Sequence, residues 1–322
     1  MALIVATIIA LTFGVFGSGD PTASATGAWR PLRDAGLERT EVGAARIGHS
    51  IYVVGGFLQP SQTTAAVERY EIDRDRWHRL LDMPIAVNHP AVAAHDGLLY
   101  VYGGYTDSSF GSRTAALQSY DPARRRWGLL PPAPAPRAAA ALVALGDRLF
   151  AVGGVGQDGP VATLHVYDIA ARRWRIAKPM RVAREHIAAV AAGGELYVFG
   201  GRFGARNLAA VERFDLRRGR WSRLPDLLHA RSGFSAAVVA GKPVVFGGEE
   251  LNPGGETIAP VELYDPHARR WRLLPAMRTP RHGLGGAALG RRIYALQGGP
   301  APGFAFSDSI EFLDLARRLV GR

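Results

Sequence analysis

The chain has 322 residues, of which 48% are hydrophobic, and it carries a formal charge of +11 at pH 7. This apolar content excludes a disordered chain, because the sequence can bury enough surface to fold. The absence of cysteine excludes stabilising disulfides and a cysteine-linked lipid anchor.

The N-terminal segment has the composition of an export signal. Residues 2–16 form an uncharged apolar run that is short for a membrane-spanning helix, and Ala23, Ser24 and Ala25 offer a small-residue cleavage site. We therefore predict a signal peptide over residues 1–25 and a mature domain over 26–322, in the periplasm or outside the cell. No Lys or Arg precedes the apolar run, so an uncleaved N-terminal anchor is the alternative.

A sixfold repeat follows, marked by tryptophan and a Gly-Gly pair. Each Trp precedes the next Gly-Gly by 26 residues in five copies and by 27 in the last. The tryptophans are Trp29, Trp77, Trp127, Trp174, Trp221 and Trp271, and the pairs begin at Gly55, Gly103, Gly153, Gly200, Gly247 and Gly298. A period near 50 residues predicts a β-propeller, in which one repeat forms one sheet.

The fourth copy shows the elements that each repeat contributes. Arg184 opens a small-residue strand, a second strand ends at Gly200, the sequence Val-Glu-Arg-Phe-Asp over 211–215 forms a third, and Trp221 marks a fourth. Four short strands separated by turns at fixed spacing are typical of one propeller blade. The strand around Trp29 has no blade before it, so we expect it to complete the last blade and close the ring.

This pattern resembles the kelch repeat, because Gly-Gly, a Tyr-Asp-like pair and Trp recur at fixed offsets. The resemblance covers roughly residues 29–322. It implies an all-β, six-bladed kelch-type β-propeller with a central funnel and with loops that carry binding.

One face of the predicted propeller carries the variable loops. The separation from Gly-Gly to the next Trp ranges from 21 to 24 residues, whereas the Trp to Gly-Gly spacing is nearly constant. Length variation confined to one segment indicates loops that specialise for binding. These loops contain aromatic residues that suit sugars or peptides, although some rings can equally pack between loops: Phe57, Tyr105, Phe110, Phe203 and Phe304.

An arginine opens the innermost strand in five of the six copies, and Val87 takes this place in the second copy. These are Arg39, Arg137, Arg184, Arg231 and Arg281. We expect them at the funnel rim, where converging guanidinium groups favour an anionic ligand such as a carboxylate. The alternative is that each arginine only holds the loop backbone in place.

Neighbouring positions complete the candidate ligand site. Asn88 is expected beside the arginines, and the resemblance implies a second set of contacts directly after Gly-Gly, at Phe57, Tyr105, Arg202 and Glu249. The expected partner at this face is a protein, a peptide or an acidic glycan.

Two functions are compatible with this site. The first is a non-catalytic binding propeller, which requires only the loop face. The second is a sugar isomerase, because bacterial sialic acid mutarotases are also exported six-bladed kelch propellers. Such an enzyme would use Glu185 or Glu41 with His186 or His89 for proton transfer.

Other chemistries are not expected. The chain resembles the central domain of galactose oxidase, but the copper cofactor of that enzyme needs a cysteine, which is absent. We expect no cofactor and no metal, since His282 is one position out of step with His89 and His186 and funnels are usually too wide for one ion. The Arg-rich turns before each Trp are solvated turns or contact an anionic envelope surface, and we expect no nucleic-acid partner.

Overall fold

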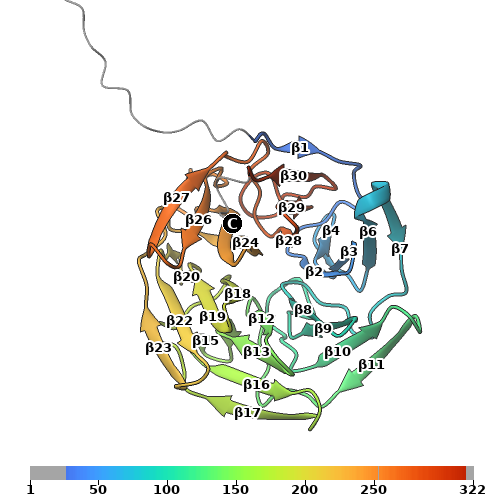
Figure 1. The fold of residues 1–322 in the computed structure, drawn as a ribbon. Helices are drawn as coiled ribbons and strands as arrows, with labels where there is room; N and C mark the ends of the chain where they lie inside the picture. Colours follow the sequence, from blue (N-terminus) through green and yellow to red (C-terminus); the bar gives the residue numbers. More distant parts are fainter. Residues whose placement is uncertain (1–26, 253, 317–322) are drawn as a thin grey trace, which may run out of the picture.

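The computed structural model describes residues 27–252 and 254–316, and within them it is a six-bladed β-propeller (Figure 1). Each blade is an antiparallel sheet of four strands, and the only helical element described is the short 3-10 turn η1 (Ile72–Arg74). The predicted all-β, six-bladed fold is therefore confirmed. The predicted signal peptide lies outside the described residues. None of the described residues forms a helix with the length and apolarity needed to cross a membrane.

The blades follow one another along the chain, each running from the axis outward. The first three are β2 (Gly43–Ile47), β3 (Ser50–Val54), β6 (Val67–Glu71) and β7 (Arg76–Arg79); β8 (Ala91–His95), β9 (Leu98–Tyr102), β10 (Leu117–Asp121) and β11 (Arg126–Leu130); and β12 (Ala141–Ala144), β13 (Arg148–Val152), β16 (Leu164–Asp168) and β17 (Arg173–Ala177). The next two are β18 (Ala188–Ala192), β19 (Glu195–Phe199), β22 (Val211–Asp215) and β23 (Arg220–Arg223); and β24 (Ser232–Val239), β25 (Lys242–Glu249), β26 (Val261–Asp265) and β27 (Arg270–Leu274).

The last blade is built from both ends of the described chain. It combines β28 (Gly285–Leu289), β29 (Arg292–Leu296) and β30 (Ile310–Asp314) with the N-terminal strand β1 (Arg30–Pro31). In this antiparallel pairing Arg30 lies opposite Phe312 and Pro31 opposite Glu311. Trp29, directly before β1, is buried between the fifth and sixth blades. The predicted closure of the ring is confirmed.

The hydrophobic core is divided into six clusters, each between two neighbouring blades. The repeated tryptophans join these blades, since every indole N–H donates to a backbone carbonyl of the blade before it. Trp77, for example, donates to Arg33 O at 2.8 Å, and Trp29 donates to Pro275 O at 3.0 Å across the closure. The same contact in all six copies explains the constant spacing of Trp in the sequence.

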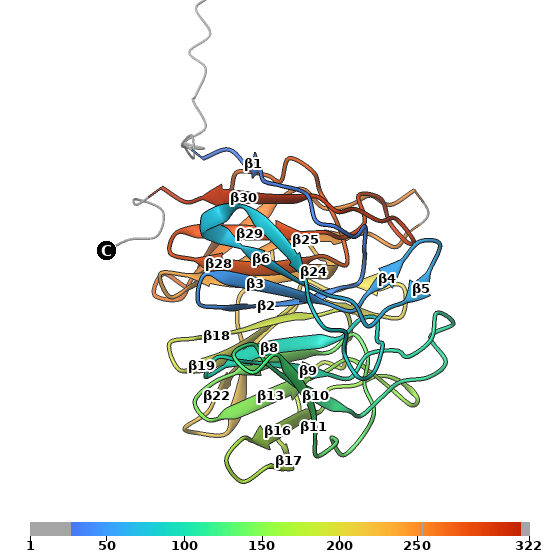
Figure 2. The same ribbon diagram turned by 90° about the vertical axis from the view of Figure 1, so that its right-hand side faces the viewer.

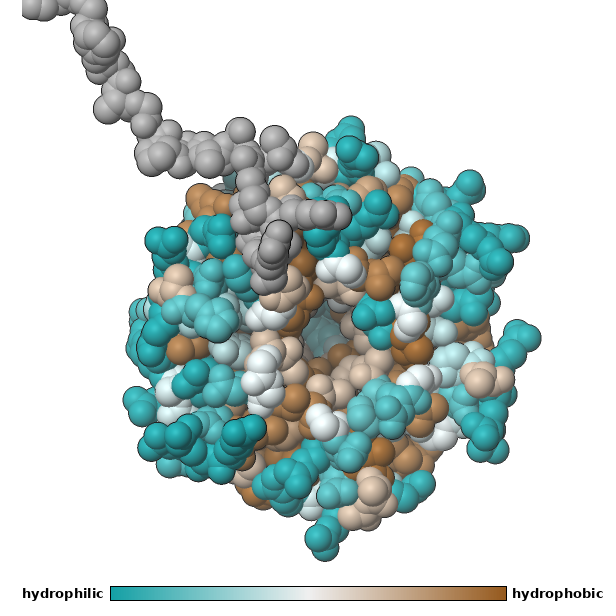
Figure 3. All heavy atoms as spheres, viewed as in Figure 1, coloured by the Kyte–Doolittle hydropathy of each residue, from teal (hydrophilic) through white to brown (hydrophobic). Residues whose placement is uncertain are grey.

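The two faces of the ring differ. On one face, the connections between the second and third strands form three small hairpins: β4 (Phe57–Leu58) with β5 (Gln62–Thr63), β14 (Val155–Gly156) with β15 (Gly159–Pro160), and β20 (Arg202–Phe203) with β21 (Arg206–Asn207). Figure 2 shows β4 and β5 projecting from this loop face at the right. The opposite face, seen in Figure 3, is hollowed at its centre among apolar side chains.

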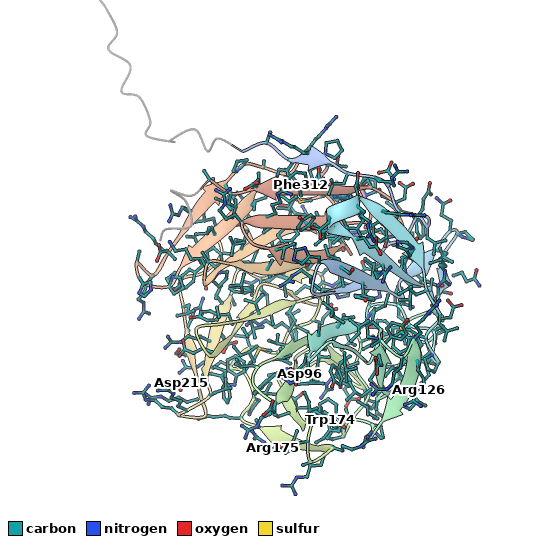
Figure 4. All side chains as sticks on the ribbon, turned by 45° about the vertical axis from the view of Figure 1, so that its right-hand side comes forward. Asp96, Arg126, Trp174, Arg175, Asp215 and Phe312 are labelled. Carbon is teal, nitrogen blue, oxygen red and sulfur yellow. The ribbon has the colours of Figure 1, made fainter. Side chains whose placement is uncertain are left out.

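The outer strands carry the arginine-rich turns. The labelled side chains of Arg126 and Arg175 lie at the periphery of the ring (Figure 4), and both are exposed. Some of these arginines pair with an acidic residue three positions earlier, as Arg124 does with Asp121 at 2.7 Å and Arg218 with Asp215 at 2.8 Å. The turns are thus solvated and partly neutralised within themselves.

Candidate functional site

The centre of the loop face is organised by a ring of backbone hydrogen bonds. One residue from each blade takes part, and all six have a positive φ between 50° and 62°. The N–H of His89 donates to Glu41 O at 3.0 Å, that of His186 to Ala139 O at 2.9 Å, and that of Gly283 to Gly233 O at 2.7 Å. We call this set the axial ring: Glu41, His89, Ala139, His186, Gly233 and Gly283. All six line the central channel, so any side chain here is presented to the axis.

In five of the six blades the residue before the axial position is paired with the residue that follows the Gly-Gly, and in the sixth blade His282 pairs with Gly299, the second glycine of the pair. These backbone bridges join Asn88 with Tyr105, Glu185 with Arg202, and Ser232 with Glu249. In these five blades the positions after Gly-Gly that the sequence analysis singled out therefore lie directly beside the axial ring. This pairing follows from the antiparallel register of the two innermost strands, which continues past the Gly-Gly turn.

A cavity of about 440 Å³ opens on the loop face above the axial ring, and we call it the loop pocket. All six blades and their loops contribute residues to it. The lining residues are Thr40, Glu41, Phe57, His89, Tyr105, Phe110, Val155, Pro160, Glu185, His186, Arg202, Gly204, Glu249, Leu251, His282, Gly303 and Phe304. A cavity of this volume holds a peptide side chain or a small ligand.

One side of the loop pocket is aromatic. Phe57 is buried and contacts Phe304 and Phe110 edge to face, with ring centroids 5.4 Å and 6.0 Å apart. Tyr105 lies 5.1 Å from Phe110. Phe110 and Phe304 are 39% and 52% exposed, so they present apolar surface that nothing in the chain covers within the described residues. Such edge-to-face clusters are rigid and suited to stacking against an apolar or amphipathic group.

The floor of the loop pocket is polar and charged. Glu41 Oε2 lies 3.2 Å from His89 Nε2. Glu185 contacts both His186 Nδ1 and Arg202 Nε, the latter at 2.6 Å. Arg202 also lies 3.5 Å from Glu249, so it bridges two carboxylates. The floor therefore combines three carboxylates with one guanidinium group.

Two groups on this floor have displaced pKa values. Burial lowers the pKa of His89 well below its ordinary value, and the nearby charges of His186 and Arg202 act in the same direction. Burial alone would raise the pKa of Glu185, but the charges and hydrogen bonds of His186 and Arg202 outweigh it and lower the value to about 2. Glu185 is thus held ionised and makes a poor proton donor near neutral pH.

Comparison with known proteins agrees with this geometry. Residues 41–225, more than half of the chain, match the family profile described as the KLHDC2/KLHL20/DRC7 Kelch-repeats domain.

The chain belongs to the kelch-repeat family.

Several curated kelch proteins share part of its sequence. Kelch-like protein terF of Aspergillus terreus is 34% identical over 40% of this chain and 31% of its own length. Beta-scruin of Limulus polyphemus is 31% identical over 39% of this chain and 14% of its own. Kelch-like protein 38 of Rattus norvegicus is 33% identical over 34% of this chain and 20% of its own length. The chain thus matches less than a third of the length of each of these relatives.

The structure corrects the expected position of the kelch arginines. Arg39, Arg184, Arg231 and Arg281 are fully buried inside their blades and do not line the loop pocket. Arg184 shows the arrangement: Nη1 donates to Gly200 O at 2.9 Å and to Ala210 O at 2.5 Å, and Nη2 lies 3.3 Å from Glu212. The guanidinium group therefore binds the carbonyl of Gly-Gly and the glutamate of the third strand. This is the alternative in which each arginine holds the loop backbone in place.

The pairing of arginine with glutamate is kept in four blades and is altered in the second and third. Arg39, Arg184, Arg231 and Arg281 face Glu68, Glu212, Glu262 and Glu311, respectively. In the second blade Val87 stands with Gln118 instead. In the third blade Arg137 has lost its glutamate, because His165 occupies that position, and Arg137 donates to Thr163 Oγ1 at 2.6 Å. Arg137 also lies outside the loop pocket.

The remaining candidate residues divide into two groups. Phe57, Tyr105, Arg202 and Glu249, which the resemblance implied, all line the loop pocket. So do the four residues considered for proton transfer, Glu41, His89, Glu185 and His186. Asn88 is fully buried beneath the pocket, where its amide donates to Thr63 Oγ1 at 2.7 Å and to Asp107 O at 2.9 Å.

Val155 and Leu251 are among the lining residues that the sequence did not single out. Val155 holds the same position after Gly-Gly as Phe57 and Tyr105, so the repeat rule could have found it. Leu251 comes from an irregular loop and carried no such signal. Phe110, Phe304 and His282 had been noted in the sequence without being assigned to the site, and the structure places all three in the pocket.

Proposed function

We propose that this kelch propeller is a protein-binding module and that the loop pocket receives a segment of the partner protein. The observation that carries the proposal is the exposed aromatic surface of Phe110 and Phe304 over a polar floor. Binding sites commonly combine aromatic residues, which contribute most of the binding free energy, with a few polar groups that orient the ligand. An apolar side chain of the partner would pack on the aromatic side while its backbone or polar end reaches the floor.

The charge of the pocket argues against the anionic ligand expected from the sequence. That expectation depended on a ring of free guanidinium groups, but four of the five are buried and paired with glutamates. Among the described residues that line the pocket, Arg202 is the one arginine, and it faces Glu185 and Glu249, with Glu41 nearby. We therefore propose that the inserted segment is neutral or carries a cationic group, which these carboxylates would attract.

We further propose that binding takes place outside the cytoplasm, because residues 1–25 have the composition of a signal peptide. Expression of the full chain in its source, followed by cell fractionation and N-terminal sequencing, tests this location. A mature N-terminus near Thr26 in the extracytoplasmic fraction is the expected result, and an intact chain in the cytoplasm would contradict it.

The binding proposal is tested by affinity capture with three variants of the full chain. Phe110→Ala and Phe304→Ala each remove half-exposed pocket surface, whereas Phe203→Ala removes a ring that is 56% exposed and lies outside the pocket. A partner captured by the wild-type chain and identified by mass spectrometry should be lost with the two pocket variants and retained with Phe203→Ala. Truncation of a central aromatic anchor typically costs about 2 kcal/mol or more of binding free energy.

Two results would overturn the proposal. Equal capture by all three variants would place the partner on another surface. Failure to capture any protein, together with accelerated anomer exchange of an acidic sugar followed by proton NMR, would replace a binding module with a sugar isomerase.

A further inference from the structure

We propose that Glu41, His89 and His186 form a binding site for one divalent transition-metal ion at the floor of the loop pocket. These three side chains come from the first, second and fourth blades. One ligand atom from each lies within 4.8 Å of the other two, and Glu41 Oε2 and His89 Nε2 are only 3.2 Å apart. The inference concerns the pocket floor itself and does not depend on the identity of any protein partner.

The two histidine rings are oriented as metal ligands are. His89 Nδ1 lies 2.6 Å from the side-chain oxygen of Asn88, and His186 Nδ1 contacts the carboxylate of Glu185. In both cases the partner is the residue directly before the histidine. A hydrogen bond from Nδ1–H to an oxygen fixes the tautomer in which Nε2 carries no proton and has a lone pair available for a metal. Metal-ligating histidines usually have such a hydrogen bond at their other ring nitrogen.

The backbone holds the three ligands rigidly. All three are axial-ring residues with φ between 51° and 53°. The ring of hydrogen bonds ties them to the neighbouring blades, and it closes where the N–H of Val42, next to Glu41, donates to Gly283 O at 3.1 Å. The other axial positions, Ala139, Gly233 and Gly283, have no or almost no side chain. A Cβ on Gly283 would stand 2.7 Å from Glu41 Cδ, so glycine at this position is what allows the carboxylate to lie over the axis.

The width of the funnel is the point on which the sequence reasoning against a metal was wrong. His89 and His186 lie on non-adjacent blades, yet their ring centroids are 4.8 Å apart. The other part of that reasoning holds, because His282 belongs to the position before the axial ring and its Nε2 lies 2.8 Å from Gly303 O. Glu41 fills the third ligand position in its place.

The ligand set indicates the kind of ion. Two imidazoles with one carboxylate bind zinc, and the same set binds Fe(II) and related first-row ions, whereas Ca²⁺ and Mg²⁺ prefer all-oxygen sites. Three protein ligands leave at least one coordination position, and the loop pocket is the space above it. The ion would therefore be accessible to a donor atom of whatever enters the pocket.

Arg202 is the group that competes with the ion. Its Nη2 lies 3.2 Å from His186 Nε2, so one contact must be exchanged when a metal binds. Arg202 keeps its contacts with Glu185 at 2.6 Å and with Glu249 at 3.5 Å, which do not involve His186. Removal of this positive charge should strengthen metal binding, because like charges close together repel strongly in a partly buried site.

The chain itself supplies variants that test the site without disturbing the fold. His89→Gly and His186→Gly each place at one axial position the residue that Gly233 and Gly283 already provide at others, with the same positive φ. His49→Ala is the matched control, because His49 is exposed, pairs with Asp73 at 2.8 Å and lies outside the loop pocket. A loss confined to the axial variants therefore reports on the site.

The experiment is isothermal titration of chelator-treated full-length chain with ZnCl₂, supported by the visible spectrum after addition of Co²⁺. Wild type and His49→Ala should bind one ion per chain at micromolar concentration. His89→Gly and His186→Gly should lose that ion, and Arg202→Gln should bind it more tightly than wild type.

The outcomes that overturn the proposal are specific. Wild-type chain that takes up no zinc at micromolar concentration, or axial variants that retain full stoichiometry, would exclude this site. Unchanged or weaker binding by Arg202→Gln would place the ion away from His186. Because no partner protein is added, these results are independent of whether the loop pocket binds a protein.

Discussion

The buried arginine of the fourth blade provides the sharpest test of how this kelch propeller is held together. Arg184 is fully buried, and its guanidinium group donates to Gly200 O and Ala210 O and pairs with Glu212, which is also buried. Replacement by valine leaves the carboxylate of Glu212 without its charge partner. Breaking a buried ion pair in this way costs about 3–5 kcal/mol of unfolding free energy.

The second blade shows how this cost can be avoided. There the equivalent residues are Val87 and Gln118, and the Gln118 amide exchanges hydrogen bonds with the backbone of Ile85, at 2.9 Å and 3.2 Å. The double variant Arg184→Val/Glu212→Gln copies this solution into the fourth blade. We expect it to recover most of the lost stability and to remain within about 1–2 kcal/mol of wild type, since no buried charge is left unpaired.

Equilibrium unfolding in urea, followed by tryptophan fluorescence and far-ultraviolet circular dichroism, measures both variants. Trp221 reports directly, because its indole lies in the core between the third and fourth blades. The reasoning is refuted if Arg184→Val is as stable as wild type, or if the double variant is no more stable than the single one. Either result would mean that the ion pair and hydrogen bonds of Arg184 do not stabilise the fold, and that its guanidinium group is free to bind a ligand.

Two further predictions concern the blades themselves. Burial, reinforced by Arg137, lowers the pKa of His165 to about 4, below the unfolded value of about 6.5. Between these two values the unfolded chain binds more protons than the folded chain does. The contribution of His165 to the free energy of unfolding is therefore fully present above pH 6.5, and the free energy falls by roughly 3 kcal/mol towards pH 4. His165→Gln, compared with wild type by urea unfolding across this range, should lack that part of the pH dependence; an identical slope in both proteins would contradict it. Gly247 and Gly241 both have φ of 75°, but a Cβ on Gly247 would stand 2.7 Å from Arg281 O, whereas one on Gly241 meets nothing within 4 Å. Both alanine variants carry the strain of positive φ, about 1–2 kcal/mol, so Gly247→Ala should melt at a clearly lower temperature than Gly241→Ala, and equal melting would show that the Gly-Gly turn adjusts.

The blades could be predicted from the sequence because their determinants are local and repeated. Five of the six sheets form from strands that are close in the chain. The nearly constant distance from Trp to Gly-Gly reflects one contact, in which the indole N–H donates to a carbonyl of the preceding blade. The closure of the ring could be predicted from the same repeat, because Trp29 marks a fourth strand that has no blade before it. The positions after Gly-Gly also followed from the repeat, and Phe57 and Tyr105 line the loop pocket as the family resemblance implied.

The direction of side chains at the funnel was decided only by the tertiary structure. Arg39 and Glu41 are two positions apart, yet one is sealed inside a blade against Glu68 and the other reaches the axis, because Glu41 adopts a positive φ in a ring closed by all six blades. A single repeat cannot form that ring, so no local pattern reveals it. The convergence of Glu41 with His89 and His186 has the same origin: residues from three separate blades meet because the propeller closes, and this distance depends on the ring and not on the spacing in the chain.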